Sequence, residues 1–362
     1  MGGRAHELDA GCGHASRLLP GSHGAGRCPL PVGLGFTSRG IGMSSSGFKY
    51  TVVIPHYNSA GKLARLVASI PQRMDIQIVV VDDLSESAEA DAVRSNEALI
   101  ERAQVLFPRR KLTAGGARNV GLGEAKGTWI LFADADDFFE PGAFDVLDRE
   151  ISESKGAFDV FYFKVQGFRE AGMEPSDRGL RWNRILDRYG RFSRFDHVVP
   201  WAKLVRHQLI KDHGITFEEV RYSNDLMYSA RLAFASDAVR IIDAVLYNLE
   251  EGDGGLTSHK SQEDSFLRRE VQLRHETLLF ERLPEEFVAE HRYVFYRKYL
   301  RDSIKFGTGR LRELRNQYEK AAGISPFNLF RIRYFVFSCL TRLGLPKKWM
   351  GSGPGAPYWA RD

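Results

Sequence analysis

Aspartate residues follow hydrophobic runs at two places in this 362-residue sequence. Asp82 and Asp83 come directly after Val-Val-Val, and Asp134, Asp136 and Asp137 come directly after Trp-Ile-Leu-Phe-Ala. Clustered carboxylates repel one another unless a cation lies between them, and their hard oxygen atoms select Mg²⁺ or Mn²⁺. Such an ion usually keeps open positions for substrate phosphates. The pattern predicts a divalent metal site that receives a phosphate-containing ligand, although solvated turns and helix caps use the same residues.

The elements that must position these aspartates alternate regularly from Lys49 onward. Apolar β-branched runs predict strands at 50–55, 76–82, 104–107 and 128–133, and helical spacing predicts helices at 61–70, 87–102 and 115–126. Strands that are apolar along nearly their whole length are covered on both faces. Repeated β-α units predict an α/β fold with a mostly parallel sheet flanked by helices. Ligands bind such sheets beyond the carboxyl ends of the strands.

The sequence after this region is less regular. It predicts a strand at 159–165, an Arg- and Gly-rich loop at 166–200, and strands at 239–242 and 244–248. Beyond 262, apolar residues at three- and four-residue spacing predict a helical C-terminal region. We expect an extension at 1–46, an α/β domain at 47–260, a helical region at 261–350 and a flexible tail at 351–362.

Composition limits the possible classes. With 43% hydrophobic and 27% charged residues, the bulk of the chain is globular. Residues 1–42 hold 11 of the 35 glycines and no apolar period, so we expect disorder there, and Met43 is a candidate true start. Three cysteines, at 12, 28 and 339, match no disulfide framework or zinc ligand pair, which favours a reducing compartment.

Four motifs, in order, resemble those of the inverting family 2 glycosyltransferases of the nucleotide-sugar-dependent GT-A fold. They are Val52–Asn58, Val79–Ser85, Gly115–Gly121 and Trp129–Asp137, within a resemblance that extends from Thr51 to Ser258. The resemblance implies a Rossmann-like GT-A domain over 47–260 and a hexosyltransferase-type enzyme, EC 2.4. It also implies transfer of a sugar, carried by UDP, to a hydroxyl of a glycan or lipid-linked acceptor with inversion, as in cell-surface polysaccharide synthesis.

The resemblance also implies a role for each matching residue. The nucleoside is framed by Pro55, Tyr57 and Asn58, and Asp83 hydrogen-bonds its base. Arg118, in Gly116-Ala117-Arg118-Asn119, approaches the nucleotide. Asp136 is the direct metal ligand, and Asp134 lies nearer the ribose or a metal-bound water. Independently of the family, a helix N-terminus and an arginine favour a diphosphate. The structural alternatives are a surface salt bridge for Arg118 and a helix cap for Asp83.

Inversion by direct displacement needs one base that takes the acceptor proton. The family places it in a Glu-Asp pair at a helix start, and Asp225 takes that position here. Asn224 stands where glutamate is usual, so the role of the first member of the pair is open. Glu218 and Glu219 are possible substitutes, and an N-terminal helix charge is the alternative for Asp225.

A glycine-rich loop follows the last predicted strands. The segment Gly254-Gly255-Leu256-Thr257-Ser258-His259-Lys260 resembles the family's Ser-Leu-Thr loop, which could close over the diphosphate. His259 is then a candidate third metal ligand, with an ordinary surface histidine as the alternative.

Two other functions compete with glycosyl transfer. A sugar nucleotidyltransferase needs a Gly-rich loop with Arg and Lys directly after the first strand, where this chain has His56-Tyr57-Asn58-Ser59. A membrane-attached, non-catalytic scaffold of the same fold is favoured by Asn224 alone. Motifs of NTPases, serine hydrolases and zinc proteases are absent from the sequence.

The C-terminal segment combines basic and apolar residues. Residues 291–350 hold 14 Lys and Arg residues against three acidic ones, and 326–350 adds aromatic and aliphatic bulk. This mixture predicts contact with an anionic membrane surface, with a helix packed on the catalytic domain as the alternative. No uncharged apolar run reaches about 18 residues, so we expect a cytoplasmic protein, peripheral at the inner face of the membrane, that binds no nucleic acid.

Overall fold

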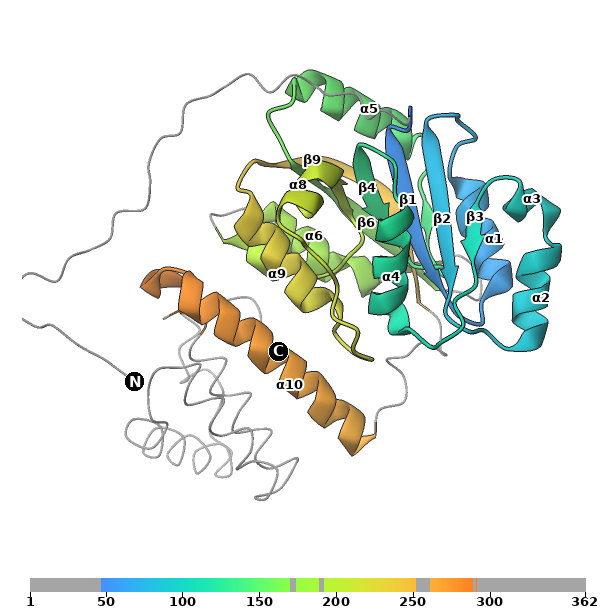
Figure 1. The fold of residues 1–362 in the computed structure, drawn as a ribbon. Helices are drawn as coiled ribbons and strands as arrows, with labels where there is room; N and C mark the ends of the chain where they lie inside the picture. The colour runs from blue at the N-terminus through green and yellow to red at the C-terminus, as the bar shows by residue number, and fades with distance from the viewer. Residues whose placement is uncertain (1–46, 170–173, 189–191, 252–260, 289–290, 292–362) are drawn as a thin grey trace, which may run out of the picture. The chain divides into compact units, whose positions relative to one another are not determined.

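The computed structural model describes residues 47–169, 174–188, 192–251, 261–288 and 291. Within this part, nine strands form one sheet in the order β3-β2-β1-β4-β8-β6-β9-β5, with β7 paired to β6 (Figure 1). The first four strands along the chain are β1 (Tyr50–His56), β2 (Ile76–Asp82), β3 (Gln104–Leu106) and β4 (Trp129–Phe132). They pair in parallel, because a helical crossover connects each to the next.

The crossover helices are α1 (Ala60–Ser69), α2 (Ser87–Ser95), α3 (Glu97–Ile100) and α4 (Thr113–Glu124). One long helix was expected at 87–102, and this prediction was wrong. Asn96 adopts an extended conformation, and its side chain accepts a hydrogen bond from the Leu99 backbone NH, which starts a second helix. Asparagine favours such a cap over the interior of a helix.

The second half of the sheet is mixed. The strand β8 (Lys203–Arg206) runs antiparallel to β4, and β6 (Val160–Arg169) is antiparallel to β8 but parallel to β9 (Val239–Glu251). The short strands β5 (Phe138–Phe139) and β7 (Glu174–Ser176) pair antiparallel at β9 and β6. The predicted α/β class with flanking helices is confirmed, and the parallel arrangement holds for β3-β2-β1-β4 and β6-β9.

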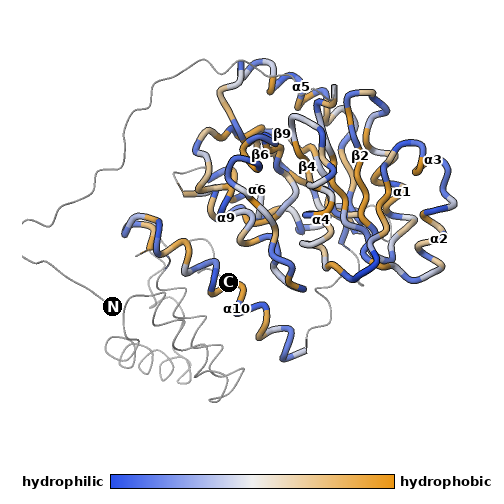
Figure 2. The backbone as a smooth tube through the Cα atoms, viewed as in Figure 1, coloured by the Kyte–Doolittle hydropathy of each residue, from blue (hydrophilic) through white to orange (hydrophobic). Residues whose placement is uncertain are grey.

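Alternation along the buried strands supplies two hydrophobic cores, one on each face of the sheet. Val52 and Ile54 pack toward α1 and α5 (Ala143–Ser154), whereas Val53 lies in a cluster with residues of α8 (His207–Asp212) and α9 (Asp225–Ala235). Figure 2 shows β2 and β4 as largely hydrophobic segments, as expected of strands covered on both faces.

The region from 166 to 200 is more ordered than a loop. It contains the end of β6, then β7, the 3₁₀ turn Asp177–Gly179, α6 (Leu180–Asp187) and α7 (Ser193–Asp196). The two strands expected at 239–242 and 244–248 form one strand, β9, with bulges opposite Phe163 and Lys164 that shift its register. Bulges interrupt the simple alternation that would identify a continuous strand.

The helix α10 (Gln262–Arg282) lies in the region expected to be helical. It begins with a capping box in which Ser261 and Asp264 exchange hydrogen bonds, and Leu279 packs with Ala230 and Ala233 of α9. Residues 1–46, 252–260 and 292–362 lie outside the described residues, so the predicted domain boundaries stay predictions. Among the described residues, no helix is both long and apolar enough to cross a membrane.

Candidate active site

The carboxyl ends of β1, β2 and β4 meet at one edge of the sheet, here called the rim. His56 and Asp82 are paired in the sheet register, and His56 Nδ1 lies 2.8 Å from Asp82 Oδ2. Both side chains are buried, and the Ser59 NH donates to His56 Nε2. Burial raises the pKa of Asp82, but hydrogen bonds from Ser85 and His56 outweigh it and lower the pKa. Asp82 therefore stabilises the rim through these hydrogen bonds, and the contact of Asp83 with a base stays a prediction.

Asp83 and Tyr57 lie on either side of Lys111. Asp83 is 5% exposed, and its Oδ1 accepts a 2.5 Å hydrogen bond from the Leu112 NH. Lys111 Nζ donates to the Asp83 carbonyl oxygen at 2.6 Å and lies 3.2 Å from the centre of the Tyr57 ring. The Tyr57 side chain is about half exposed. An exposed aromatic ring beside a carboxylate can stack on a nucleobase and hydrogen-bond its edge.

Pro55 and Asn58 shape the loop that follows β1. Pro55 lies within β1, opposite Val81, and Asn58 joins this loop to the one after β2. The Asn58 NH donates to Ser85 Oγ at 2.9 Å, and Asn58 Oδ1 accepts from the Glu86 NH at 2.8 Å. Asn58 therefore connects the two loops through its hydrogen bonds to Ser85 and Glu86.

Left-handed backbone conformations gather beside the candidate residues. Six described non-glycine residues have positive φ. One of them, Lys155, caps the C-terminus of a helix away from the candidate residues. The other five are Asn58, Leu84, Thr113, Ala202 and Ser223, each next to or within two residues of a site segment or a buried charge. Such conformations cost energy and persist where the surrounding structure enforces them, which is common at functional sites.

Arg118 joins two segments that are far apart in the sequence. From α4, its Nη1 donates to Asn224 Oδ1 at 2.9 Å and its Nη2 donates to Asp134 Oδ1 at 2.5 Å. Arg118 is 5% exposed, so the surface salt bridge does not describe it, and its predicted approach to a nucleotide stays a prediction. Asn224 stands where the family has glutamate. Its side-chain oxygen accepts a hydrogen bond from Arg118, so Asn224 helps to hold this arginine in place.

The Asp134–Asp137 segment is held by residues that the sequence did not single out. The Asp134 NH donates to the Tyr247 hydroxyl at 2.9 Å, and Arg65 Nη2 donates to the Asp136 carbonyl oxygen at 2.6 Å. Arg65 also pairs with the buried carboxylate of Glu250, at the end of β9. Glu250 follows an apolar run, which is the same signal that identified the aspartates.

The donor set at Asp134 and Asp136 fits a hard divalent cation. Burial and the charge of Asp134 raise the pKa of Asp136, and burial and the charges of Asp136 and Asp134 raise that of Asp137. Asp137 Oδ1 accepts from the Glu250 NH, and its fully buried Oδ2 has no partner among the described residues. A cation at Asp134 and Asp136 would relieve this repulsion.

The described residues do not form a complete metal cage. No group of three or more His, Cys, Asp or Glu side chains in this part of the chain is placed to hold a metal ion. His259 lies outside the described residues, so its role as a third ligand stays a prediction. Magnesium commonly takes one or two protein carboxylates together with substrate phosphates and water, which suits Asp134 and Asp136.

Asp225 is the first residue of α9 and lies between charged groups. Burial raises its pKa, the positive charges of Arg118 and Lys203 lower it, and Asp134 raises it. A carboxyl group with a raised pKa at a site edge suits general-base chemistry. Glu218 and Glu219, the other candidates, pair instead with Arg274 at 3.1 Å and Arg110 at 3.4 Å.

The segment before α9 packs closely on the start of α4. Asn119 Nδ2 donates to the Phe217 carbonyl oxygen at 3.0 Å, and the Phe217 NH donates to Asn119 Oδ1 at 2.9 Å. A Cβ atom on Gly115 would overlap the Glu218 carbonyl oxygen and lie 2.9 Å from Asn224 Cβ. The missing side chain of Gly115 therefore leaves the space that this segment occupies.

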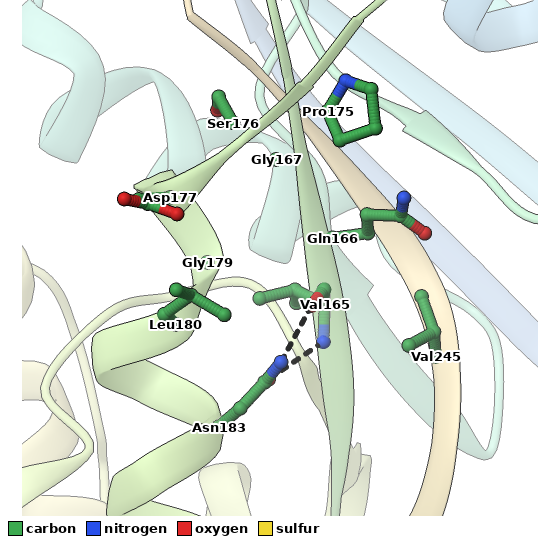
Figure 3. Close-up of a pocket in the computed structure, with 10 residues that line it drawn as sticks. All are labelled: Val165, Gln166, Gly167, Pro175, Ser176, Asp177, Gly179, Leu180, Asn183 and Val245. Carbon is green, nitrogen blue, oxygen red and sulfur yellow. Dashed lines mark hydrogen bonds between the residues drawn. The ribbon is translucent and has the colours of Figure 1, made fainter.

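A pocket of about 350 Å³ opens where β6, β7 and α6 meet (Figure 3). Asn183 closes one side, because its amide donates to the Val165 carbonyl oxygen and accepts from the Val165 NH (Figure 3). Arg178 lies between the lining residues Asp177 and Gly179, and its charge lowers the pKa of Asp136 against the effect of burial.

The chain is similar to known glycosyltransferases. Residues 51–214 match the family model described as glycosyl transferase family 2. This part of the chain is a glycosyltransferase family 2 domain, and the predicted resemblance to that family is confirmed. This glycosyltransferase is 23% identical to EpsJ of Bacillus subtilis, an uncharacterised glycosyltransferase, over 61% of this chain and 67% of that protein. The predicted class of enzyme, a transferase of EC 2.4 type, is confirmed.

Other relatives of this glycosyltransferase act on, or help to make, polymers. It is 24% identical to TarS of Staphylococcus aureus, a poly(ribitol-phosphate) β-N-acetylglucosaminyltransferase, over 60% of this chain but 39% of TarS. It is 37% identical to the succinoglycan biosynthesis protein ExoO of Rhizobium meliloti, over 30% of each chain. The chain therefore spans well under half of either protein.

A solved structure confirms the fold of this glycosyltransferase. Residues 1–349 of Staphylococcus aureus TarS, in complex with UDP-GlcNAc, match it with a TM-score of 0.51 and 22% identity. The match covers 66% of this chain and 69% of the TarS chain. The predicted GT-A fold class is therefore confirmed.

Proposed function

We propose that this glycosyltransferase moves a sugar from a nucleoside diphosphate donor, UDP-linked, to a hydroxyl of a glycan or lipid-linked acceptor. The observation that carries the proposal is the contact of Arg118 with both Asp134 and Asn224. This contact joins the aspartate segment to the helix that starts with Asp225. A group that binds a diphosphate and a group that takes a proton are thus parts of one site.

The donor's nucleoside lies against the loops after β1 and β2. Tyr57 stacks on the base, Asp83 accepts from it, and Lys111, which the sequence did not single out, lies between them. Pro55 and Asn58 hold the shape of this slot. The complex of TarS with UDP-GlcNAc supports a nucleotide-sugar donor.

The diphosphate lies at Asp134 and Asp136, which would hold a Mn²⁺ or Mg²⁺ ion. When bound, the ion stabilises the negative charge that develops on the leaving diphosphate. Arg118 fixes the direction of the Asp134 carboxylate, and Arg65 fixes the backbone of Asp136. These two arginines therefore set the spacing of the two carboxylates.

Asp225 acts as the general base. Its carboxylate takes the proton of the acceptor hydroxyl as the hydroxyl oxygen attacks the anomeric carbon. The bond from that carbon to the diphosphate breaks on the opposite face, so configuration is inverted. We assign the acceptor's neighbouring groups to the pocket beside Arg178 (Figure 3), because the charge of Arg178 lowers the pKa of Asp136.

A donor panel tests the proposal. The purified full chain is mixed with individual nucleotide sugars, Mn²⁺ and candidate acceptors, and released nucleoside diphosphate is measured. We expect one UDP-sugar to give the highest turnover, and excess EDTA to stop it. Full turnover in EDTA would contradict the metal, and incorporation of a nucleotide rather than release of a diphosphate would favour a nucleotidyltransferase.

The basic C-terminal segment is proposed to contact an anionic membrane at the inner face. The residues concerned, 326–350, lie outside the described residues, so the support is their sequence alone. Deleting 326–362 should release the protein from anionic liposomes and leave activity on a soluble acceptor largely intact, because each basic residue contributes about 1 kcal/mol near such a surface. Absence of liposome binding by the full chain would contradict this proposal.

A further inference from the structure

Lys203 is a buried lysine with few polar partners. It is the first residue of β8, is 1% exposed, and follows Ala202, whose φ of 56° is left-handed. Its Nζ donates to Ser229 Oγ at 2.9 Å, and Ser229 Oγ donates to the Val198 carbonyl oxygen. One neutral acceptor does not offset the cost of burying an ammonium group.

Asp225 is the acid that acts on this lysine. Ser229 is four residues after Asp225 on α9, so Lys203 contacts the same side of the helix one turn below the carboxylate. Burial lowers the pKa of Lys203 to about 7, and the charge of Asp225 raises it. In the other direction, Lys203 lowers the pKa of Asp225.

Other charged groups also face the pair. Arg118 from α4 lowers the pKa of Asp225 more than Lys203 does, and Asp134 after β4 raises it by a smaller amount. Beside Lys203 are Tyr162 of β6 and His197, whose two ring nitrogens have no partner among the described residues. Burial and the charge of Lys203 lower the pKa of His197, so this histidine stays neutral.

We propose that Lys203 is a positioning residue for the base: its ammonium group, held at Ser229, keeps the buried Asp225 carboxyl group ionised and ready to accept a proton. This inference rests on the proposed role of Asp225. It differs from a packing role, because it depends on the charge of Lys203 and not on its shape.

The test compares pH profiles of kcat/KM for wild type, Lys203→Met and Lys203→Gln. Without the positive charge, Asp225 holds its proton more tightly, so the acidic limb should move to higher pH by about one unit in both variants. At pH values below the limb, this shift lowers kcat/KM about tenfold. The exposed Lys211→Met is the matched control and should keep the wild-type limb.

Two variants separate charge from structure. Lys203→Gln can still form a hydrogen bond with Ser229. If the acidic limb of the pH profile matches wild type in Lys203→Gln but not in Lys203→Met, Lys203 acts through that hydrogen bond and the proposal is overturned. Ser229→Ala keeps the charge and should keep the acidic limb close to that of wild type. A limb that does not move in either Lys203 variant would also overturn it.

Stability gives a readout independent of catalysis. A lysine with a folded-state pKa near 7 and an unfolded pKa near 10.5 binds more protons when unfolded, so stability rises with pH between these values. We expect this rise in wild type and Lys211→Met, and a smaller one in Lys203→Met. If Asp225→Asn keeps parental turnover, the proposed base has failed instead, whatever the stability of the Lys203 variants.

Discussion

The Asp134–Asp137 segment and the start of α9 both present carboxylates, but their surroundings differ. In the first, three aspartates lie within four residues, and burial with mutual repulsion raises the pKa of Asp136 and Asp137. At the second, burial raises the pKa of the single carboxyl group of Asp225, and the charges of Arg118 and Lys203 lower it by less. The first environment is suited to receive a cation, and the second to receive a proton.

Asp136→Ala tests the first environment and should have the largest effect. Transfer should fall by at least about a thousandfold, because loss of a metal ligand leaves several kcal/mol of developing charge uncompensated. The fold should survive, since the residue lies at the rim. Turnover and melting temperature are measured beside the exposed Asp91→Ala, and near-normal turnover would remove the metal from this segment.

Asp225→Asn tests the second environment. Asparagine has nearly the same shape but cannot take a proton, so turnover should fall by about two to four orders of magnitude while donor affinity is kept. Calorimetric titration of the donor and steady-state rates separate the two. If the rate stays parental, the base lies elsewhere, and Glu218 and Glu219 are the residues to substitute next.

Arg118→Met tests the connection between the two environments. It leaves Asp134 and Asn224 without their buried donor, so the free energy of unfolding should fall by about 3 kcal/mol. Denaturant titration measures the loss. The exposed Arg94→Met, which breaks an ion pair with Asp91, is the control and should cost less than about 1 kcal/mol. Equal costs for the two variants would show that Arg118 is not a buried link.

Gly115→Ala tests the close packing that holds the base segment on α4. The added methyl group must displace Glu218 or Asn224, which should lower stability by about 1–3 kcal/mol. Gly123→Ala, in the same helix, meets nothing within 4 Å and should raise stability by up to about 1 kcal/mol. Melting curves of both variants measure these changes. A stability change in the same direction for both variants would contradict the close packing at Gly115.

The sequence identified the rim well and the connections across it poorly. The strands β1, β2 and β4 are continuous apolar runs, so their ends, and the aspartates after them, could be located from neighbouring residues alone. Tyr247, Arg65 and Lys203 could not, because each acts on a residue far away in the chain. A lysine inside the apolar Trp201-Ala202-Lys203-Leu204 run was the one available signal for the last of these.

The sequence by itself determined the alternation of buried strands and helices and the candidates Asp83, Asp136 and Asp225, because hydrophobic period and motif order are local properties. The tertiary structure alone decided that Arg118 contacts Asn224, 106 residues away, and that Gly115 admits Glu218. It also placed Lys203 beside α9, where it contacts Ser229, which is 26 residues further along the chain. Such contacts depend on how distant segments pack, and side-chain spacing along one segment carries no information about them.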